Sequence, residues 1–350
     1  MTVSVAPMTG EQRVLAAARR QPTDVTPVWF MRQAGRCLAD YRALRERYDI
    51  LTLAKTPELS AQVTLMPINT FGVDAAVMFA DIMLPLEPMG VELEIQPDVG
   101  PIIHNPIRTP SDVDRLRVFE PAEGVGFVLD AIRLVRRELS GKKAVIGFSG
   151  APFTLACYLI EGRPSREYAR AKSFMYREPE AWTALMEKLS EVIVRYLRAQ
   201  IDAGAQIVQL FDSWVGALAP ADYEQYVQPH VAGIFGAITE APTIHFGAGT
   251  AALLESMAAA GGDLISIDAH QSIDVAWARV GYDRGVQGNL DATRVLAGWE
   301  ATEAGARDVL RRAAGRPAHI FNLGHGVLPG SDPDILRRLV NFVHEETAAR

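Results

Sequence analysis

Short apolar runs alternate with longer amphipathic segments along the whole chain. Each run is almost continuously hydrophobic, which is typical of parallel strands that helices cover. The runs predicted as strands are residues 25–30, 74–79, 144–149, 206–211, 242–246, 263–268, 284–289 and 318–323. Alternating strands and helices indicate βα units, and eight such units are the number that closes into a single α/β fold of the (β/α)8 TIM barrel type.

An open doubly wound sheet is the alternative arrangement of these elements, but no GxGxxG motif follows the first predicted strand. Residues 90–107, "GVELEIQPDVGPIIHNPI", alternate differently and contain three prolines, so we expect a hairpin-like excursion in the second βα connection. No low-complexity linker interrupts the pattern. We therefore expect residues 1–350 to form one barrel domain, with residues 1–10 flexible.

Composition narrows the function classes. The formal net charge is −7 and no basic stretch of useful length is present, which argues against a nucleic-acid partner. Cys37 and Cys157 are the only cysteines, which excludes a disulfide framework and a Cys-rich zinc module and fits a reducing compartment. Gly147, Gly150 and Pro152 break the longest uncharged run, and the N-terminal segment has no apolar signal core, so we expect a cytoplasmic protein with no membrane partner.

Polar side chains follow the predicted strands, where the active sites of barrels lie. Caps of the following helices explain Ser, Asp and Asn at such positions, but they do not explain arginines or a histidine. In strand order the polar residues are Arg32 and Arg36, Asp81, Ser149, Asp212 and Ser213, His245, Asp268, Asn289, and His325.

The first strand ends in "PVWFMRQAGR" and delivers Arg32 and Arg36 to one place. A loop with two solvated arginines is the simpler interpretation. However, a guanidinium stays cationic and matches a carboxylate bidentately. Because no Walker-type phosphate loop is present, two arginines at one end of a barrel favour a ligand with several carboxylates or phosphates.

Four further residues each have a structural and a functional interpretation. Asp81 in "FADIM" is either a helix cap or a carboxylate that gathers N–H donors or stabilises a cation. Tyr158 in "GAPFTLACYLIEG" fits the core with its hydroxyl at the rim, and Ser213 in "LFDSW" fits a cap. His325 in "NLGHGVLP" lies between two glycines, which allow close approach to a ligand or a flexible surface loop.

These motifs carry a family resemblance. "PVWFMRQAGR" and "GFSGAPFTLACYLIEG", with "FADIM", "QLFDSW" and "NLGHG" in the same order, resemble the uroporphyrinogen decarboxylase family over nearly the whole chain. The resemblance implies a single (β/α)8 barrel, usually a homodimer whose active sites face each other. It also implies removal of the four acetate carboxyls of uroporphyrinogen III as carbon dioxide, giving coproporphyrinogen III in haem biosynthesis without metal or organic cofactor.

The resemblance also implies roles for single residues. Asp81 would bind the central pyrrole N–H groups, and Tyr158, Ser213 and His325 would contact the substrate. Asp81, Arg32 and Tyr158 are the implied catalytic residues, and the proton donor stays open between Arg32, Tyr158 and water. The implied substrate-binding set is Arg32, Gln33, Ala34, Gly35, Arg36, Asp81, Tyr158, Ser213 and His325.

Two other function classes fit part of the pattern. A zinc-dependent corrinoid or thiol methyltransferase can share this barrel, but it needs converging thiolate and imidazole ligands. His245 has no cysteine near it in the sequence, which argues against that class and against any metal site. A non-catalytic tetrapyrrole binder would not need Asp81 beside two arginines.

Overall fold

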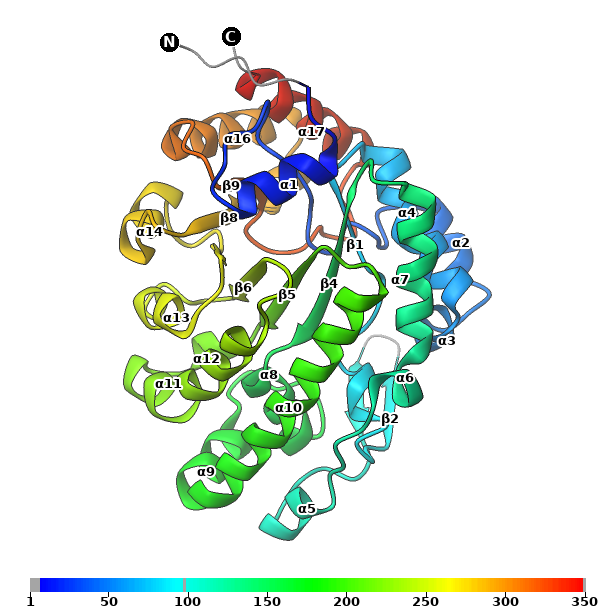
Figure 1. Cartoon of the computed structure of the whole chain (residues 1–350), viewed down its shortest axis with the longest axis vertical. Helices are drawn as coiled ribbons and strands as arrows, with labels where there is room; N and C mark the ends of the chain where they lie inside the picture. Colours follow the sequence, from blue (N-terminus) through cyan, green and yellow to red (C-terminus); the bar gives the residue numbers. More distant parts are fainter. Residues whose placement is uncertain (1–6, 97–98, 349–350) are drawn as a thin grey trace.

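The computed structural model describes residues 7–96 and 99–348, which form a curled parallel sheet inside a layer of helices (Figure 1). The seven strands of this sheet pair in the order β1-β4-β5-β6-β7-β8-β9, each parallel to its neighbour. Their bounds are β1 Ala75–Val77, β4 Ala144–Gly150, β5 Ile207–Asp212, β6 Thr243–Gly247, β7 Leu264–Ser266, β8 Gly285–Leu290 and β9 His319–Leu323. The predicted α/β barrel is confirmed.

The predicted strand over residues 25–30 is wrong in extent, because the segment makes only one bridge, from Val28 to Phe321. It still occupies the eighth position of the barrel. The Phe321 N–H donates to the Pro27 carbonyl (2.9 Å) on one side, and the Asp74 N–H donates to the Val28 carbonyl (2.7 Å) on the other. Pro27 has no N–H to continue a ladder, so the segment closes the sheet without becoming a regular strand.

The predicted excursion is an antiparallel hairpin in the connection between β1 and β4. Its strands β2 (Leu93–Gln96) and β3 (Gly100–Ile103) pair in register from Leu93 opposite Ile103. The N–H of Ile103 donates to the Gly162 carbonyl (2.8 Å), which docks the hairpin on the end of α8 (Pro152–Glu161). The hairpin therefore lies apart from the barrel sheet (Figure 1).

Helices surround the sheet, and the first and last helices, α1 and α17, lie on the same side of the molecule (Figure 1). Of the segment predicted to be flexible, residues 1–6 lie outside the described residues, whereas Thr9 caps α1 in a capping box with Gln12. The remaining helices are α-helices and the short 3-10 turns η1 and η2. Their bounds are α1 Gly10–Ala18, α2 Ala39–Arg45, α3 Ile50–Lys55, α4 Pro57–Phe71, η1 Leu84–Leu86, α5 Pro110–Asp114, α6 Pro121–Gly124, α7 Gly126–Leu139, α9 Ala169–Arg177, α10 Pro179–Ala203, η2 Val215–Ala217, α11 Pro220–Tyr226, α12 Gln228–Ala237, α13 Leu254–Ala260, α14 Ile273–Val280, α15 Thr293–Leu296, α16 Trp299–Ala313 and α17 Pro333–Thr347.

The barrel interior contains a buried hydrogen-bonded network. Trp29 Nε1 donates to Gln287 Oε1 (2.9 Å), and Gln287 Nε2 donates to Gln209 Oε1 (3.1 Å) and Ser266 Oγ (2.9 Å). Since β5 and β8 are not neighbours in the sheet, the contact between the two glutamines crosses the interior. These side chains are fully buried and hydrogen-bonded to one another. They therefore fill the barrel interior below the loops at the carboxyl ends of the strands.

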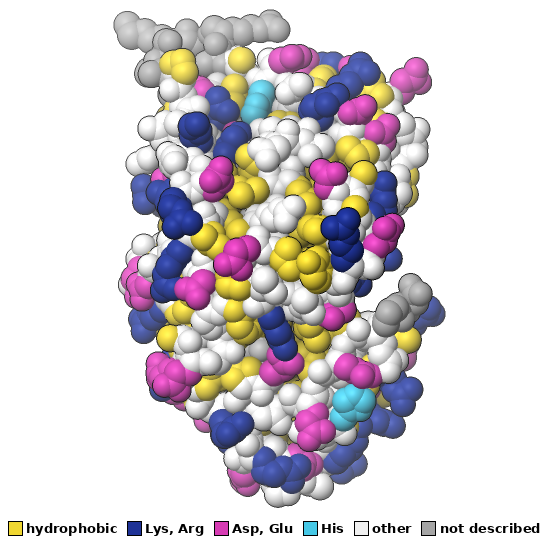
Figure 2. Space-filling model, turned by 90° about the vertical axis from the view of Figure 1, so that its right-hand side faces the viewer, with side chains coloured by type: hydrophobic (Ala, Val, Ile, Leu, Met, Phe, Trp, Pro, Cys, Tyr) yellow, Lys and Arg dark blue, Asp and Glu magenta, His cyan; other side chains and the backbone are white. Residues whose placement is uncertain are grey.

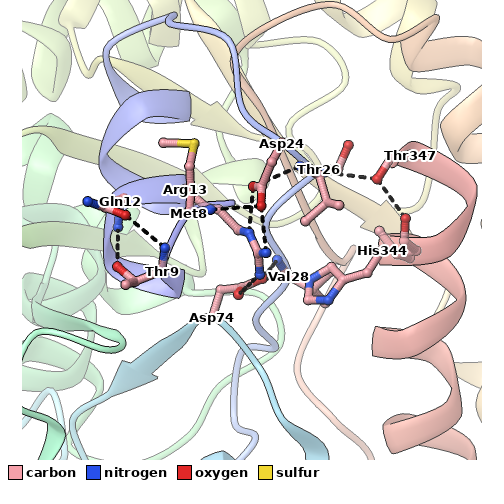
Figure 3. A network of polar contacts seen from close by, with 12 residues as sticks. Met8, Thr9, Gln12, Arg13, Asp24, Thr26, Val28, Asp74, His344 and Thr347 are labelled. Carbon is pink, nitrogen blue, oxygen red and sulfur yellow. Dashed lines mark hydrogen bonds and ion pairs between the residues drawn. The ribbon is translucent and has the colours of Figure 1, made fainter. Parts of the chain in front are cut away.

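A second network joins the start and the end of the chain at the N-terminal end of the barrel (Figure 3). Asp74, which is fully buried, accepts from the Val28 N–H (2.9 Å), from Arg13 (3.2 Å) and from His344 Nε2 (2.8 Å). Arg13 also binds Asp24 through Nε (2.7 Å). The network thereby ties α1, the segment at the eighth barrel position, β1 and α17 to one carboxylate.

The surface carries both signs of charge. Figure 2 shows the side of the molecule on which α4 and α7 lie, where basic and acidic side chains alternate between apolar ones. Within the part of the chain that the structure describes, none of the helices combines the length and the apolar character needed to span a bilayer.

Candidate active site

The C-terminal rim, by which we mean the loops that follow the carboxyl ends of the barrel strands, begins with Arg32. Its backbone lies in the left-handed region at φ 56°, which is uncommon for a side chain other than glycine. Both backbone polar groups of the preceding residue, Met31, are hydrogen-bonded. Asn322 Oδ1 accepts from the Met31 N–H (3.1 Å), and the Val327 N–H donates to the Met31 carbonyl (2.8 Å). The loop after β9 therefore fixes the position from which the exposed Arg32 side chain projects.

Gln33 supports this loop from inside the fold. Its side chain is fully buried, accepts from the Phe30 N–H (3.0 Å) and donates to the Ala75 carbonyl (2.9 Å). The amide therefore joins the eighth barrel position to β1. Because both ends of the side chain are engaged, Gln33 can meet a ligand only through its backbone.

The rest of the loop is less buried. Ala34 and Gly35 are half-buried, and Arg36 is exposed. The positive charge of Arg36 acts on the phenol of Tyr41, which is buried in α2. Arg36 therefore lies close enough to α2 for its charge to act on Tyr41.

Asp81 follows β1 and is half-buried in the rim. Its Oδ1 accepts from the Met83 N–H (2.8 Å). Met83 is itself the N-cap of η1, which has no side-chain cap bond, so Asp81 stabilises the turn before η1 and does not cap this helix. Oδ2 makes no hydrogen bond to any described residue. Burial raises the pKa of Asp81 above its usual value, while the Met83 N–H and the charge of Arg32 oppose that rise. The carboxylate is therefore poorly solvated and has one oxygen available for donors from a ligand.

Tyr158 lies near the end of α8 in an aromatic stack. Its ring centroid is 4.0 Å from that of Trp214, and the Trp214 ring lies 4.9 Å from that of Tyr168. Burial and the negative charge of Asp81 raise the pKa of Tyr158, and Arg32 opposes this. The phenol consequently stays neutral and can donate a hydrogen bond beside Asp81.

A second aromatic cluster lies at the end of the barrel interior. The Phe211 ring lies 5.4 Å from that of Phe148 and 5.6 Å from that of Phe246, both edge-to-face. These rings come from β5, β4 and β6, close to where those strands end. They provide an apolar floor under the charged groups of the rim.

Ser213 is half-buried directly after β5. Its neighbour Asp212 is fully buried and accepts from Thr154 Oγ1 (2.8 Å), which in turn accepts from the Trp214 N–H (3.3 Å). Burial raises the pKa of Asp212 to about 7. This chain of bonds sets the turn that carries Ser213 and Trp214 toward Tyr158.

His325 is exposed on the loop after β9. Burial of part of its ring and the charge of Arg32 lower its pKa, and Asp268 opposes this. A Cβ added to the next residue, Gly326, would lie 2.5 Å from Arg32 Cδ. The Arg32 side chain therefore lies directly over this glycine, beside His325.

The structure brings four of the predicted residues together. The charge of Arg32 acts on Asp81, Tyr158 and His325, which come from the loops after β1 and β9 and from α8. Ser213 joins them through the stack of its neighbour Trp214 on Tyr158, whereas the charge of Arg36 acts on Tyr41 of α2. His245, although it follows the same pattern in sequence, packs on Phe235 of α12 at 5.0 Å between ring centroids and belongs to the helix side of the sheet.

Sequence reasoning missed two residues of this rim, Trp214 and Tyr168. It placed Asp268 at a strand end and Gly326 beside His325, but it did not predict the contacts that these two residues make. Asp268 accepts from the N–H groups of Gly249 (2.6 Å) and His270 (2.9 Å). Trp214 had a signal, because it directly follows the serine in "LFDSW". Tyr168 had none, because its approach depends on the path of the chain after α8.

Metal ligands do not converge within residues 7–96 and 99–348: no group of three or more His, Cys, Asp and Glu side chains there could hold an ion. The two thiols, Cys37 and Cys157, are buried and free. Burial raises the pKa of both, to about 11 for Cys37, which disfavours the thiolate that zinc requires.

Comparison with known proteins identifies similar folds and similar sequences separately. A methyltransferase from Methanosarcina mazei superposes with a TM-score of 0.81 at 19% identity, covering 97% of this chain and 99% of the other. A B12-independent methionine synthase from Shewanella sp. W3-18-1 superposes with a TM-score of 0.55 at 12% identity, covering 83% and 88%. At these identities the likeness concerns the fold alone.

The sequence relatives are much closer. A protein of Sorangium cellulosum named uroporphyrinogen decarboxylase is 56% identical over 334 residues, 95% of each chain. One of Roseiflexus sp. with the same name is 52% identical over 344 residues, covering 96% of this chain and 99% of the other. The family model described as Uroporphyrinogen decarboxylase (URO-D) matches residues 9–346. The chain therefore belongs to the uroporphyrinogen decarboxylase family, and its C-terminal rim carries Arg32, Asp81, Tyr158 and His325.

Proposed function

We propose that this protein is a carboxy-lyase that removes the four acetate carboxyls of uroporphyrinogen III and gives coproporphyrinogen III. The observation that carries the proposal is the juxtaposition of Arg32, Asp81 and Tyr158 at the C-terminal rim of a barrel that belongs to this family. The relatives that carry the name of this activity match nearly the full length of the chain.

Recognition follows from the charges of the rim. The substrate is a flexible macrocycle with eight carboxylates, and fixed guanidinium groups recognise carboxylates in the bidentate manner. Arg32, whose backbone is clamped by the β9 loop, binds a carboxylate close to Asp81, and Arg36 binds one further out. Ser213 and His325 border the same space, and the backbone of residues 33–35 lies between the two arginines. Phe148, Phe211 and Phe246 face the apolar part of the macrocycle.

Asp81 acts on the charge that develops during the reaction. A pyrrole acetate loses carbon dioxide only when a sink accepts the electron pair of the breaking carbon–carbon bond. Protonation of the pyrrole ring provides that sink, and loss of carbon dioxide then leaves a neutral ring with an exocyclic methylene. Protonation of the methylene carbon and loss of the ring proton give the methyl product. Asp81 accepts the pyrrole N–H groups and stabilises the cationic stages more than the neutral substrate.

Tyr158 and Arg32 assist in different ways. The raised pKa of Tyr158 keeps its hydroxyl protonated, so it donates a hydrogen bond near the reacting carboxylate. Arg32 holds that carboxylate and, by its charge, keeps Asp81 ionised. Water, Arg32 and Tyr158 are the groups near the rim from which the ring proton can come.

The test is direct turnover. Purified protein is incubated with uroporphyrinogen under anaerobic, reducing conditions, and the products are separated by their number of carboxyl groups. We expect species with seven, six, five and four carboxyls, and a matched Asp81→Asn preparation should leave the substrate with eight. Binding of the porphyrinogen without loss of carbon dioxide would indicate a tetrapyrrole carrier and contradict the proposal.

Three features of the protein's context belong to the same proposal. A homodimer with the rims of two copies facing each other is supported by the family and is tested by light scattering of the eluting protein. A cytoplasmic location is supported by the two free, buried cysteines, which suit a reducing compartment. Action as a single barrel domain is supported by a family match over residues 9–346.

A further inference from the structure

A cavity of about 440 Å³ lies at the N-terminal end of the barrel, opposite the C-terminal rim. It is lined by Arg19, Arg20, Trp277, Tyr282, Arg316 and Pro317. These residues come from the end of α1, from α14 and the turn before β8, and from the turn between α16 and β9, which lie near one another in Figure 1. The volume falls in the range of small-molecule sites.

Two of the three arginines of this cavity donate to main-chain carbonyls. Arg20 donates from NH1 to the Asp283 carbonyl, and Arg316 donates from NH1 to the Ala313 carbonyl (3.1 Å) at the end of α16. Within the described parts of the chain, Arg19 makes no side-chain hydrogen bond. Arg316 NH1 also lies 3.5 Å from the Arg312 carbonyl. Each of these two guanidinium groups is therefore held through NH1 alone, and among the described residues its other N–H donors have no acceptor.

Aromatic rings hold Arg316 in addition. Its Cζ lies 4.8 Å from the Tyr282 ring centroid and 5.9 Å from that of Trp277. Tyr282 is 55% exposed although it is a large aromatic residue, and Trp277 is almost fully buried behind it. Stacking fixes the plane of the guanidinium, so the cavity presents an oriented fork instead of a freely moving charge.

Carboxylates do not neutralise these arginines. No Asp or Glu among the described residues lies within ion-pair distance of Arg19, Arg20 or Arg316, and the Asp283 carboxylate turns back toward Gly281. The neighbouring arginines of α16 differ, because ion pairs with acidic residues engage each of them. These pairs are Arg307 with Glu303 and Glu346, Arg311 with Asp308, and Arg312 with Asp274 and Asp308.

We propose that this cavity binds a small oxyanion with two or more negative charges, either a phosphate compound or a polycarboxylate. Three cations that face one cavity repel each other, and an anion that accepts from their forks relieves this repulsion while satisfying the unused donors. The site is separate from the C-terminal rim and does not depend on the proposed decarboxylation.

The proposal is tested by calorimetric titration with two probes, inorganic pyrophosphate and citrate, at constant ionic strength. We expect saturable binding of at least one probe at one site per chain. Arg316→Gln and Arg19→Gln should each weaken this binding about tenfold or more, since each removes a charged fork. Arg137→Gln, which removes an exposed arginine of α7 that does not line the cavity, should leave the affinity within about twofold of the wild type.

The two probes distinguish the source of the oxyanion. Tighter binding of pyrophosphate assigns the site to phosphate compounds, and tighter binding of citrate assigns it to polycarboxylates. Absence of saturable binding of both probes overturns the proposal. Equal weakening by Arg137→Gln, or binding that survives in both cavity variants, also overturns it, because the anion would then bind elsewhere, including at the arginines of the C-terminal rim. Arg19→Gln keeps the test valid if Arg316→Gln does not fold, because the Arg19 side chain is exposed and makes no hydrogen bond or ion pair with the described residues.

Discussion

His344 Nε2 lies 2.8 Å from Asp74 Oδ2, although 270 positions separate the two residues. Asp74 directly precedes β1 and lies beside the eighth barrel position, and His344 lies in the last helix, so the contact joins α17 to the point where the barrel closes. Arg13 and the Val28 N–H bind the same carboxylate (Figure 3). A single buried anion therefore holds together segments that would otherwise be free to separate.

Asp74→Asn should destabilise the fold strongly. The amide has no charge to offset Arg13 and Lys143, and removal of one partner from a buried ionic network typically costs about 3 kcal/mol or more. The free energy of unfolding, measured by urea denaturation near pH 7, checks this. Asp130→Asn removes an exposed carboxylate that pairs with Arg133 at 2.7 Å and should change stability by about 0.5 kcal/mol or less.

The difference in stability between wild type and Asp74→Asn should depend on pH. Burial alone would raise the pKa of Asp74, but His344, Lys143 and the Val28 N–H together hold that pKa below its usual 3.8. A carboxyl with a lowered pKa stabilises the folded state above its unfolded pKa, and this contribution is lost as the pH falls through the folded-state value. The stability difference between wild type and Asp74→Asn should thus be largest above pH 3.8 and shrink below it. A difference that stays constant through this acidic range would show that Asp74 acts by shape alone.

Asp81 has a structural and a catalytic task, and two substitutions separate them. Asp81→Asn keeps an oxygen that can accept from the Met83 N–H, so stability should stay within about 0.5 kcal/mol of wild type. Loss of the charge opposite the developing cation should lower kcat about a hundredfold or more. Asp81→Ala should lose the same activity and also about 1 kcal/mol of stability, because the Met83 N–H loses its acceptor. If Asp81→Asn kept kcat within twofold, the turn bond to the Met83 N–H would be the only role of this residue.

Gly326 is predicted to control the position of Arg32. A Cβ at this glycine would lie 2.5 to 2.9 Å from the Cδ, Cγ and Cβ atoms of Arg32, so Gly326→Ala must displace that side chain. Misplacement of a binding group by about 1 Å can cost about a hundredfold in rate, and we expect kcat/KM to fall between about tenfold and a hundredfold with the fold intact. Gly233→Ala in α12, where a Cβ meets no atom within 4 Å, should leave kcat/KM unchanged. Equal kcat/KM for both variants and the wild type would contradict the contact.

The barrel and most of the C-terminal rim could be predicted from the sequence because both follow from short-range signals. Continuous apolar runs identify parallel strands, and the residues after them must meet at one rim. Arg32, Asp81 and His325 were predicted in this way, whereas the role of Tyr158 came from the family resemblance. In the structure the charge of Arg32 acts on all three of the others. The hairpin over residues 93–103 was likewise visible in its different alternation.

The features that could not be predicted from the sequence depend on contacts between distant segments of the chain. Pro27 and Val28 lie in an apolar run that has the pattern of a strand. Only the contacts with Phe321 and Asp74 show that the run makes a single bridge, at Val28. Gln33 lies between two arginines, yet its side chain turns inward to the Ala75 carbonyl. The Gly326 contact with Arg32 was hidden for the same reason, because it spans almost the whole chain.

Chelation should leave the activity unchanged. The reaction as proposed uses the charges of Arg32 and Asp81, and the described residues contain no cluster of metal ligands. Protein dialysed exhaustively against a strong chelator should retain its full rate of carbon dioxide release. Loss of activity that zinc restores would contradict the decarboxylation mechanism and favour the metal-dependent methyltransferase class.

The coupling between Arg32 and Asp81 predicts a shift in the pH profile. Burial raises the pKa of Asp81 above its usual 3.8, and the charge of Arg32 opposes that rise. Since only ionised Asp81 stabilises the cation, the acidic limb of kcat/KM should lie above pH 3.8. Arg32→Gln removes the opposing charge, so the pKa of Asp81 should rise further and the acidic limb should move to higher pH, in addition to the loss in overall rate.

The position of the limb distinguishes this coupling from simple loss of binding. Carboxylates of the substrate titrate identically with every variant, so a difference between variants reports on the protein. Arg47→Gln, which removes an exposed arginine after α2, keeps Arg32 in place and should leave the limb where it is in the wild type. An Arg32→Gln profile that is lower at every pH but keeps its midpoint would show that Arg32 binds a carboxylate without acting on Asp81. A midpoint that moves to lower pH would mean that Asp81 is not the group whose ionisation limits the rate, since removal of a nearby cation can only raise the pKa of a carboxyl group.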